Sequence, residues 1–155
     1  MARFALSRDI KFFEGISREL VDVVIETAVV LYKLIVEESK TNLYGESLSK
    51  TYYQGVECSA MIQRDEAQSN YEGFGADTSQ NVEFRFNRFT LKEKQFYPEV
   101  GDIIFHNDGY FEIDNVREEQ LIGGRVETGD GEKFTIICST FMTRRSSIQT
   151  EMRIV

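Results

Sequence analysis

Residues 101–116 read GDIIFHNDGYFEIDNV, with two short apolar runs on either side of an Asn-Asp-Gly turn. Alternating apolar residues that flank such a turn are typical of a β-hairpin. The same stretch also gathers a histidine, three aspartates and a glutamate around the glycine. It therefore bears both on the fold class and on whether the chain carries a chemical site.

The register of this hairpin depends on the length of its loop. A two-residue loop at Asp-Gly would pair Phe105 with Glu112, so that apolar and charged side chains would share a face. A three-residue loop with the glycine left-handed pairs Phe105 with Phe111 and Ile103 with Ile113. Because the second register gives one clean apolar face, we predict the three-residue loop.

The opposite face of the predicted hairpin would carry Ile104, His106, Tyr110, Glu112 and Asp114. His106 is the only histidine in the chain, so a zinc site would lack ligands. A calcium loop with the glycine at its sixth position would need oxygen ligands where Ile104 and His106 stand. We therefore expect this face to point outward, either exposed to solvent or in contact with a partner. The alternative is a small metal- or ligand-binding β-barrel enzyme that uses His106, Glu112 and Asp114.

The N-terminal part of the chain predicts one helix. Residues 17–28 have Ser17 as a possible cap, followed by apolar residues at helical spacing. Residues 1–16 would then form an N-terminal arm. Residues 29–36, VVLYKLIV, could continue the helix or begin a strand, and their periodicity does not decide between the two.

Further strands are predicted on both sides of the hairpin. Residues 56–62 alternate in polarity, which predicts a half-buried strand with Cys58 on its core face. Residues 133–141 follow an Asp-Gly turn and predict another strand. Residues 64–80 show no apolar period, so we expect a long loop there, and another at 40–55.

The stretch NVEFRFNRFTL, residues 81–91, alternates at first and then loses its parity at Phe89 and Leu91. We therefore predict a strand with a β-bulge near Asn87–Arg88. Short strands joined by Asp-Gly turns after one helix predict a mainly β (α+β) chain. The expected fold is a single domain over residues 1–155, with a small antiparallel β-barrel or sandwich, one N-terminal helix and long loops.

Composition excludes several classes of protein. The 155 residues carry a net charge of −8, and their basic residues do not cluster apart from the pair Arg144–Arg145, so tight DNA binding is not expected. Two distant cysteines argue against a disulfide-stapled secreted domain. Neither a signal peptide nor a membrane span is expected. We expect a protein that folds in the cytoplasm and contacts no membrane.

Catalytic motifs are equally sparse. The sequence has no GxSxG elbow, no P-loop and no HExxH, so we expect no enzyme, no cofactor and no metal. A second rival is a single-strand nucleic-acid barrel of OB type, which needs a basic groove lined with aromatic side chains. The strand FRFNRF at 84–89, with Arg85 and Arg88, is the local candidate for that groove.

Taken in order, the β segments resemble the neck proteins of T-even-like contractile-tailed phages, which belong to the head–tail connector. The resembling segments are LYK at 31–33, LYGESLSKTY at 43–52, EGFGADTSQNVEFRFNR at 72–88, PEVGDIIF at 98–105, YFEIDNV at 110–116 and FTIICSTFMTRRSSIQTE at 134–151. The chain is shorter than the T-even type, and its first 30 residues have no counterpart. It could therefore occupy a neighbouring layer, such as the tail terminator.

The resemblance implies a structural virion protein that seals the filled head and joins it to the tail. The implied partners are copies of itself in a ring, with a hexamer favoured over a dodecamer, and the portal-side adaptor and tail-terminator proteins. Genomic double-stranded DNA would only pass through the channel, transiently and without specificity. The implied location is the virion neck, after assembly in the host cytoplasm.

A ring subunit needs contact surfaces, and aromatic side chains with a polar tip are favoured at such surfaces. The alternative for the tyrosines is that they rest on their own barrel. The predicted interface residues are Leu43, Tyr44, Glu46, Lys50, Tyr52, Tyr53, Tyr71, Phe74, Tyr110, Arg144 and Arg145.

Overall fold

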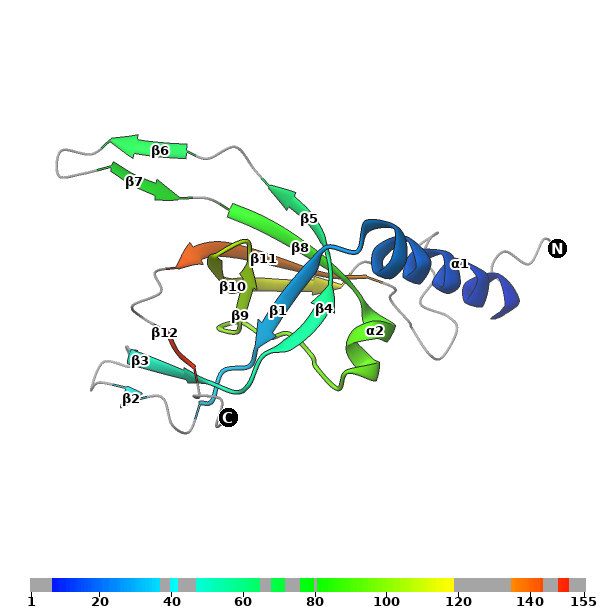
Figure 1. Ribbon diagram of the computed structural model, residues 1–155, viewed down its shortest axis with the longest axis horizontal. Helices are drawn as coiled ribbons and strands as arrows, with labels where there is room; N and C mark the ends of the chain where they lie inside the picture. The colour runs from blue at the N-terminus through cyan, green and yellow to red at the C-terminus, as the bar shows by residue number, and fades with distance from the viewer. Residues whose placement is uncertain are drawn as a thin grey trace.

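A seven-stranded antiparallel sheet forms the body of the protein in the computed structural model (Figure 1). The structure describes residues 7–36, 40–41, 47–64, 68–71, 76–79, 81–118, 135–143 and 148–150. Across the sheet the strands follow the order β4 (Val56–Ser59), β1 (Ala28–Tyr32), β9 (Ile103–His106), β10 (Gly109–Glu118), β11 (Thr135–Thr143), β8 (Asn81–Asn87) and β5 (Met61–Arg64). The mainly β prediction is therefore confirmed.

The two edges of this sheet are supplied by one segment of chain. β4 pairs with β1 and β5 pairs with β8, while Ala60 alone separates β4 from β5. Ala60 is fully buried, and its N–H donates to the carbonyl of Thr27 at 3.0 Å. A bend of this kind lets a strand pass from one sheet edge to another. The sheet is not closed into a barrel, so of the two predicted architectures it is consistent with the sandwich.

Alternation along the strands builds the core. In β8, Val82, Phe84 and Phe86 are buried, as their spacing predicts. Cys58 is also buried, as predicted. The core cluster comprises Val29, Leu31, Cys58, Ala60, Val82, Phe84, Phe86, Leu91, Phe96, Ile104, Phe111, Ile113, Ile136 and Cys138.

The register of the central hairpin differs from the prediction. Its loop is the two-residue turn Asn107–Asp108, with φ of 48° and 63°, and Gly109 already belongs to β10. Asparagine and aspartate tolerate left-handed φ better than other residues with side chains, and two such residues make the turn that suits the twist of a hairpin. The observed pairs are Gly109 with His106, Tyr110 with Phe105, Phe111 with Ile104, and Glu112 with Ile103.

Burial on both faces of β9 explains why the apolar pattern predicted the wrong register for the hairpin. Ile103 and Ile104 point to opposite faces of β9, yet both are fully buried. Ile104 belongs to the main core cluster, whereas Ile103 is buried outside it, as is Tyr52. Since neither face of β9 is open to solvent, the apolar pattern of this stretch is compatible with more than one register.

The N-terminal helix begins at Ser7, so the predicted start at Ser17 and the predicted arm over 1–16 are wrong for the described residues. Helix α1 (Ser7–Glu19) continues as a π-helical segment, η1 (Leu20–Ile25). Glu26 then adopts a left-handed conformation, φ 44°, and ends the helix. Of the undecided segment 29–36, the first four residues belong to β1 (Ala28–Tyr32), and Leu34 makes an isolated bridge with Tyr52.

The expected β-bulge after β8 is a change from strand to helix. β8 ends at Asn87, and α2 (Arg88–Glu93) begins at once. The Asn87 side-chain oxygen accepts from the Phe89 N–H at 2.9 Å and caps the helix. The lost parity at Phe89 and Leu91 therefore reflects a change of period from two residues to 3.6.

Strands also replace parts of both predicted loops. β6 (Gln68–Tyr71) and β7 (Ala76–Ser79) pair antiparallel as a hairpin that projects beyond β5 and β8 (Figure 1). In the region predicted as the first loop, β3 (Ser47–Tyr52) pairs antiparallel with β2 (Lys40–Thr41) and parallel with β12 (Ile148–Thr150). Polar strands paired outside the main sheet carry no strong apolar alternation, which is why the pattern missed them.

Candidate subunit and partner interface

Part of the predicted interface lies outside the described residues. This applies to Leu43, Tyr44, Glu46, Phe74, Arg144 and Arg145. Tyr71 ends strand β6, where its backbone pairs with Ala76. The residues that can be assessed are therefore Lys50, Tyr52, Tyr53 and Tyr110.

The neighbouring tyrosines at the end of β3 have opposite environments. Tyr52 is fully buried, so it follows the alternative in which a tyrosine rests on its own body. Burial, with the carboxylates of Glu112 and Asp102 near it, raises the pKa of Tyr52. Its hydroxyl has no hydrogen-bond partner among the described residues. Tyr53 is 52% exposed and is available to a partner.

Lys50 and Tyr110 are engaged within the chain. Lys50 Nζ forms an ion pair with Glu112 Oε1, which joins β3 to β10. The Tyr110 ring packs against Phe105, with centroids 4.9 Å apart. Both contacts lie on the face of the hairpin that carries Glu112 and Ile103. Lys50 therefore ties β3 to the hairpin, and Tyr110 packs one strand of the hairpin against the other.

The rival set of His106, Glu112 and Asp114 is not brought together. The register puts His106 on the face of Ile104 and Glu112 on the face of Ile103. The His106 ring stands edge-on to Phe84 at 6.3 Å, and its Nδ1 lies 3.3 Å from the Ala28 carbonyl oxygen. Within the described ranges, no three His, Cys, Asp or Glu side chains are grouped to hold a metal.

The two cysteines are buried thiols. Cys58 and Cys138 are both free, and they belong to the same core cluster. Burial raises the pKa of each thiol to about 12. Because the thiolate is the nucleophilic form, neither cysteine is activated at neutral pH.

The arginines proposed for a nucleic-acid groove have partners inside the chain. Arg85 Nη2 lies 3.0 Å from Gln63 Oε1 and 3.6 Å from Glu83 Oε2. Arg88 Nη1 lies 3.5 Å from Glu118 Oε2. Carboxylates at these distances offset the positive charge that phosphate binding would need.

Exposed apolar side chains form a line along the N-terminal helix, a feature that our reading of the sequence missed. We define the helix stripe as Phe12, Phe13, Ile16, Leu20, Val23 and Val24, whose residues are 44–69% exposed. They recur at intervals of three and four residues, which places them on one side of α1 and η1. The signal was present from Phe12 onward, but the helix was predicted to start after it.

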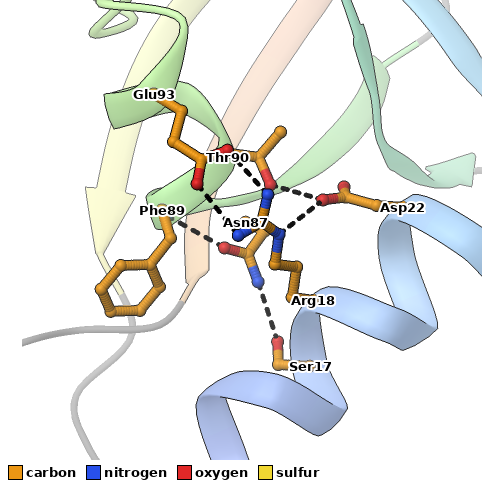
Figure 2. Close-up of polar contacts among 7 residues, drawn as sticks. All are labelled: Ser17, Arg18, Asp22, Asn87, Phe89, Thr90 and Glu93. Atoms are coloured by element: carbon orange, nitrogen blue, oxygen red, sulfur yellow. Dashed lines mark hydrogen bonds and ion pairs between the residues drawn. The ribbon is translucent and has the colours of Figure 1, made fainter. Parts of the chain in front are cut away.

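The other face of the same helix binds the body (Figure 2). Arg18 donates to both oxygens of Glu93 at 3.0 and 2.7 Å, and Thr90 Oγ1 donates to Asp22 Oδ2 at 2.5 Å. The Asn87 amide also lies 3.5 Å from Ser17 Oγ. These contacts fix the helix against α2, so the helix stripe faces away from it.

Two exposed tyrosines form a second surface that a partner could contact. We define the tyrosine patch as Tyr53 and Tyr97, which are 52% and 50% exposed. Both line a shallow depression of about 370 Å³, whose floor includes the buried ring of Phe96. The Tyr97 hydroxyl donates to Glu118 Oε1 at 2.7 Å, which orients its ring.

A charged network holds the backbone under the tyrosine patch. Lys33 Nζ donates to the Tyr97 carbonyl at 2.9 Å, to Glu99 Oε2 at 2.7 Å and to Asp102 Oδ2 at 3.1 Å. Asp102, only 1% exposed, also accepts from the N–H groups of Leu34 and Glu99 at 3.0 and 2.8 Å. Burial raises the pKa of Asp102, and these hydrogen bonds oppose that effect. The patch is therefore preformed.

Comparison with known proteins assigns no family. No family model matches the chain, and no curated protein matches it. Among solved structures, a chain of the "Virion of native gene transfer agent (GTA) particle" is similar with a TM-score of 0.44 and 13% identity, over 75% of this chain and 93% of that chain. Similarity at this level assigns neither a fold family nor a function. Among the described helices, none is long and apolar enough to span a membrane.

Proposed function

We propose that this chain is a structural protein of a phage virion, a ring subunit of the neck that joins the DNA-filled head to the tail. The order of β segments that resemble neck proteins supports this proposal. The structural observation that carries it is the exposed aromatic surface of the tyrosine patch, beside the buried ring of Phe96. Apolar surface gathered in this way marks sites of protein association.

The proposed partners are other virion proteins. Copies of the chain would form a ring, with six copies favoured over twelve, between a portal-side adaptor and a tail terminator. The chain would assemble in the host cytoplasm and remain in the virion. The net charge of −8 suits a channel wall, because like charge disfavours binding to the phosphates of passing DNA. The alternative role is that of another connector layer or the tail terminator itself.

We assign the tyrosine patch to the contact with a neighbouring subunit or ring. Tyrosine anchors in a preformed surface lose little conformational freedom when a partner binds. The Lys33 network fixes the backbone on which Tyr97 stands. A ring contact is heterologous, so the patch would meet a different surface of the next subunit.

The test is whether purified, DNA-filled tailed particles contain the chain. Quantitative mass spectrometry should find about six to twelve copies per particle, as a closed ring requires. In particles produced with Tyr53→Asp and Tyr97→Asp together, electron microscopy should show filled heads separated from tails. Val36→Asp is the matched control, because Val36 is 76% exposed and lies outside the patch.

Two results would overturn this proposal. Absence of the chain from clean particles would remove it from the virion altogether. Normal particles from the doubly substituted chain would show that the tyrosine patch is not the contact. A position in another layer of the head–tail connector in images of the particle would favour the alternative roles.

A further inference from the structure

We infer that two copies of this chain pair through the helix stripe, with their α1–η1 helices antiparallel about a two-fold axis. This pairing is a property of the free protein and does not rest on the proposed virion function. It concerns a surface different from the tyrosine patch. The argument for it comes from the shape, the extent and the charge of the helix.

The helix stripe is long enough to act as an interface. From Phe12 to Val24 it runs about 18 Å at helical rise. Its six residues together expose on the order of 500 Å². A standard protein interface buries about 800 Å² on each partner, so the stripe would supply the larger part of a modest one.

The fold presents this stripe outward. Figure 1 shows α1 at one end of the molecule, projecting beyond the sheet. Its other face is held by Arg18, Asp22 and Ser17 against α2 and its cap, as Figure 2 shows. Val21, between these residues, is buried against the body. The helix therefore cannot turn its stripe inward without breaking these contacts.

A second copy offers the best match within the described part of the chain. The other exposed large apolar residues there are Val36, Tyr53, Tyr97, Val100, Phe141 and Met142. They are distributed over separate strands and loops and make no line of comparable length. The apolar surface with the right length for the stripe is therefore the stripe of another copy.

The charges favour an antiparallel arrangement. Arg8 and Lys11 stand near the start of the helix, before most of the stripe, while Glu26 stands just after its end. None of these three has an ion-pair partner among the described residues, whereas Asp9 interacts within the chain. An antiparallel pair that overlays the two stripes about their middle brings Arg8 and Lys11 of one helix near Glu26 of the other, and it also opposes the helix dipoles. A parallel pair would bring like charges together.

Such a pair is closed. The same surface is used by both copies, so no further copy can add to it. It cannot itself generate a ring, and a ring contact must use another surface, such as the tyrosine patch. The two proposals can therefore fail independently.

The first test is the mass of the purified full-length chain in solution. Light scattering after size exclusion should give about 36 kDa at micromolar concentration, twice the chain mass of 17.9 kDa. Phe12→Glu and Val24→Glu should each weaken the dimer by at least about tenfold, because each buries a charge in the apolar contact. Val36→Glu should leave the dimer unchanged. Circular dichroism of each variant confirms that the chain is still folded.

The second test gives the orientation. Cys58 and Cys138 are buried, so a cysteine added to the helix is the reactive one. In an antiparallel pair, Ile16→Cys near the middle should form a disulfide-linked dimer rapidly, whereas Val24→Cys near the end should not. Equal cross-linking of the two variants would show a parallel pair. A monomeric native chain, or a dimer that survives Phe12→Glu, would overturn the inference outright.

Discussion

At the scale of single residues, Asp102 is the polar group on which the structure depends most. It is almost fully buried and accepts hydrogen bonds from Lys33 and from two backbone N–H groups. Its own backbone also joins β10, through the N–H of Ile113 at 2.9 Å. One residue therefore links the segment after β1, the segment before β9 and the central hairpin, the first two through its carboxylate and the third through its backbone.

We expect Asp102→Asn to lower the free energy of unfolding by about 2–3 kcal/mol, because one of the two accepting oxygens becomes an NH2 donor and Lys33 loses the negative charge that it pairs with. Urea denaturation followed by circular dichroism measures this. The matched control is Glu99→Gln, which should change stability by less than about 0.5 kcal/mol since its side chain is mostly exposed. Equal effects of the two substitutions would contradict the role of Asp102.

The buried cysteines predict a specific dependence of stability on alkaline pH. Their folded-state pKa of about 12 lies above the ordinary thiol pKa of about 8.5. Folding therefore favours the protonated thiol, and this contribution is complete below about pH 8.5 and is lost as the pH rises toward 12.

Urea denaturation at pH 8 and pH 10 tests this expectation. The native chain should lose stability over that interval. Cys138→Ala should be less stable at pH 8, because it leaves a cavity, but its stability should fall less as the pH rises. An equal slope for both proteins would show that Cys138 does not contribute to the pH dependence.

Single residues also show what the sequence can and cannot predict. The inward positions of Val82, Phe84, Phe86 and Cys58 follow from alternation, because one side of each strand meets the core. Tyr52 and Tyr53 could not be separated in this way, since β3 lies outside the main sheet. The exposure of Tyr53 became visible only in three dimensions, and its role at an interface stays a prediction.

At the scale of elements, turns and helix ends explain the main differences between prediction and structure. Asn107 and Asp108 share the left-handed turn that was attributed to Gly109, which shifted the register. The helix start was placed at Ser17 because serine is a good cap, although Ser17 in fact contacts Asn87 from inside the helix. Local signals gave the type of the N-terminal helix and of the core strands, but they missed α2 and the polar strands outside the main sheet, and tertiary contacts decided the boundaries.

The turn offers a direct test through two substitutions at one position. Asp108 is exposed and has a φ of 63°. Asp108→Gly should stabilise the chain by about 0.5 kcal/mol, because glycine adopts this φ freely. Asp108→Val should destabilise it by about 1–2 kcal/mol, because a β-branched residue is strained there. Changes of the same sign in thermal denaturation would contradict the observed turn.

The junction of β8 and α2 offers another test by substitution. Asn87 caps α2 and also approaches the N-terminal helix (Figure 2). Asn87→Ala should cost about 1–2 kcal/mol, the usual loss for a helix cap. Ser17→Ala, which removes only the 3.5 Å contact, should cost less than about 0.5 kcal/mol. If the two variants denature alike, the cap is not the main contribution of Asn87.

At the scale of the whole molecule, the mainly β character and the antiparallel strands were predictable, because alternation and turns are local patterns. The strand order was not, since β1 lies between β4 and β9, from distant parts of the chain. For the candidate interface, the type of residue was predictable, but its position on the molecule was not. Exposed aromatic residues were expected, but the helix stripe depends on which face of α1 meets α2, a property of tertiary packing.

The bend at Ala60 has a consequence for amide hydrogen exchange. Edge strands usually open separately, each with its own protection factor. Here the two edge strands, β4 and β5, are continuous through one buried residue. A fluctuation that separates one edge strand from the sheet therefore also displaces the other. The amides of 56–59 and 61–64 should therefore exchange with a common opening free energy. Widely different protection factors for the two segments would show that the two edge strands open independently.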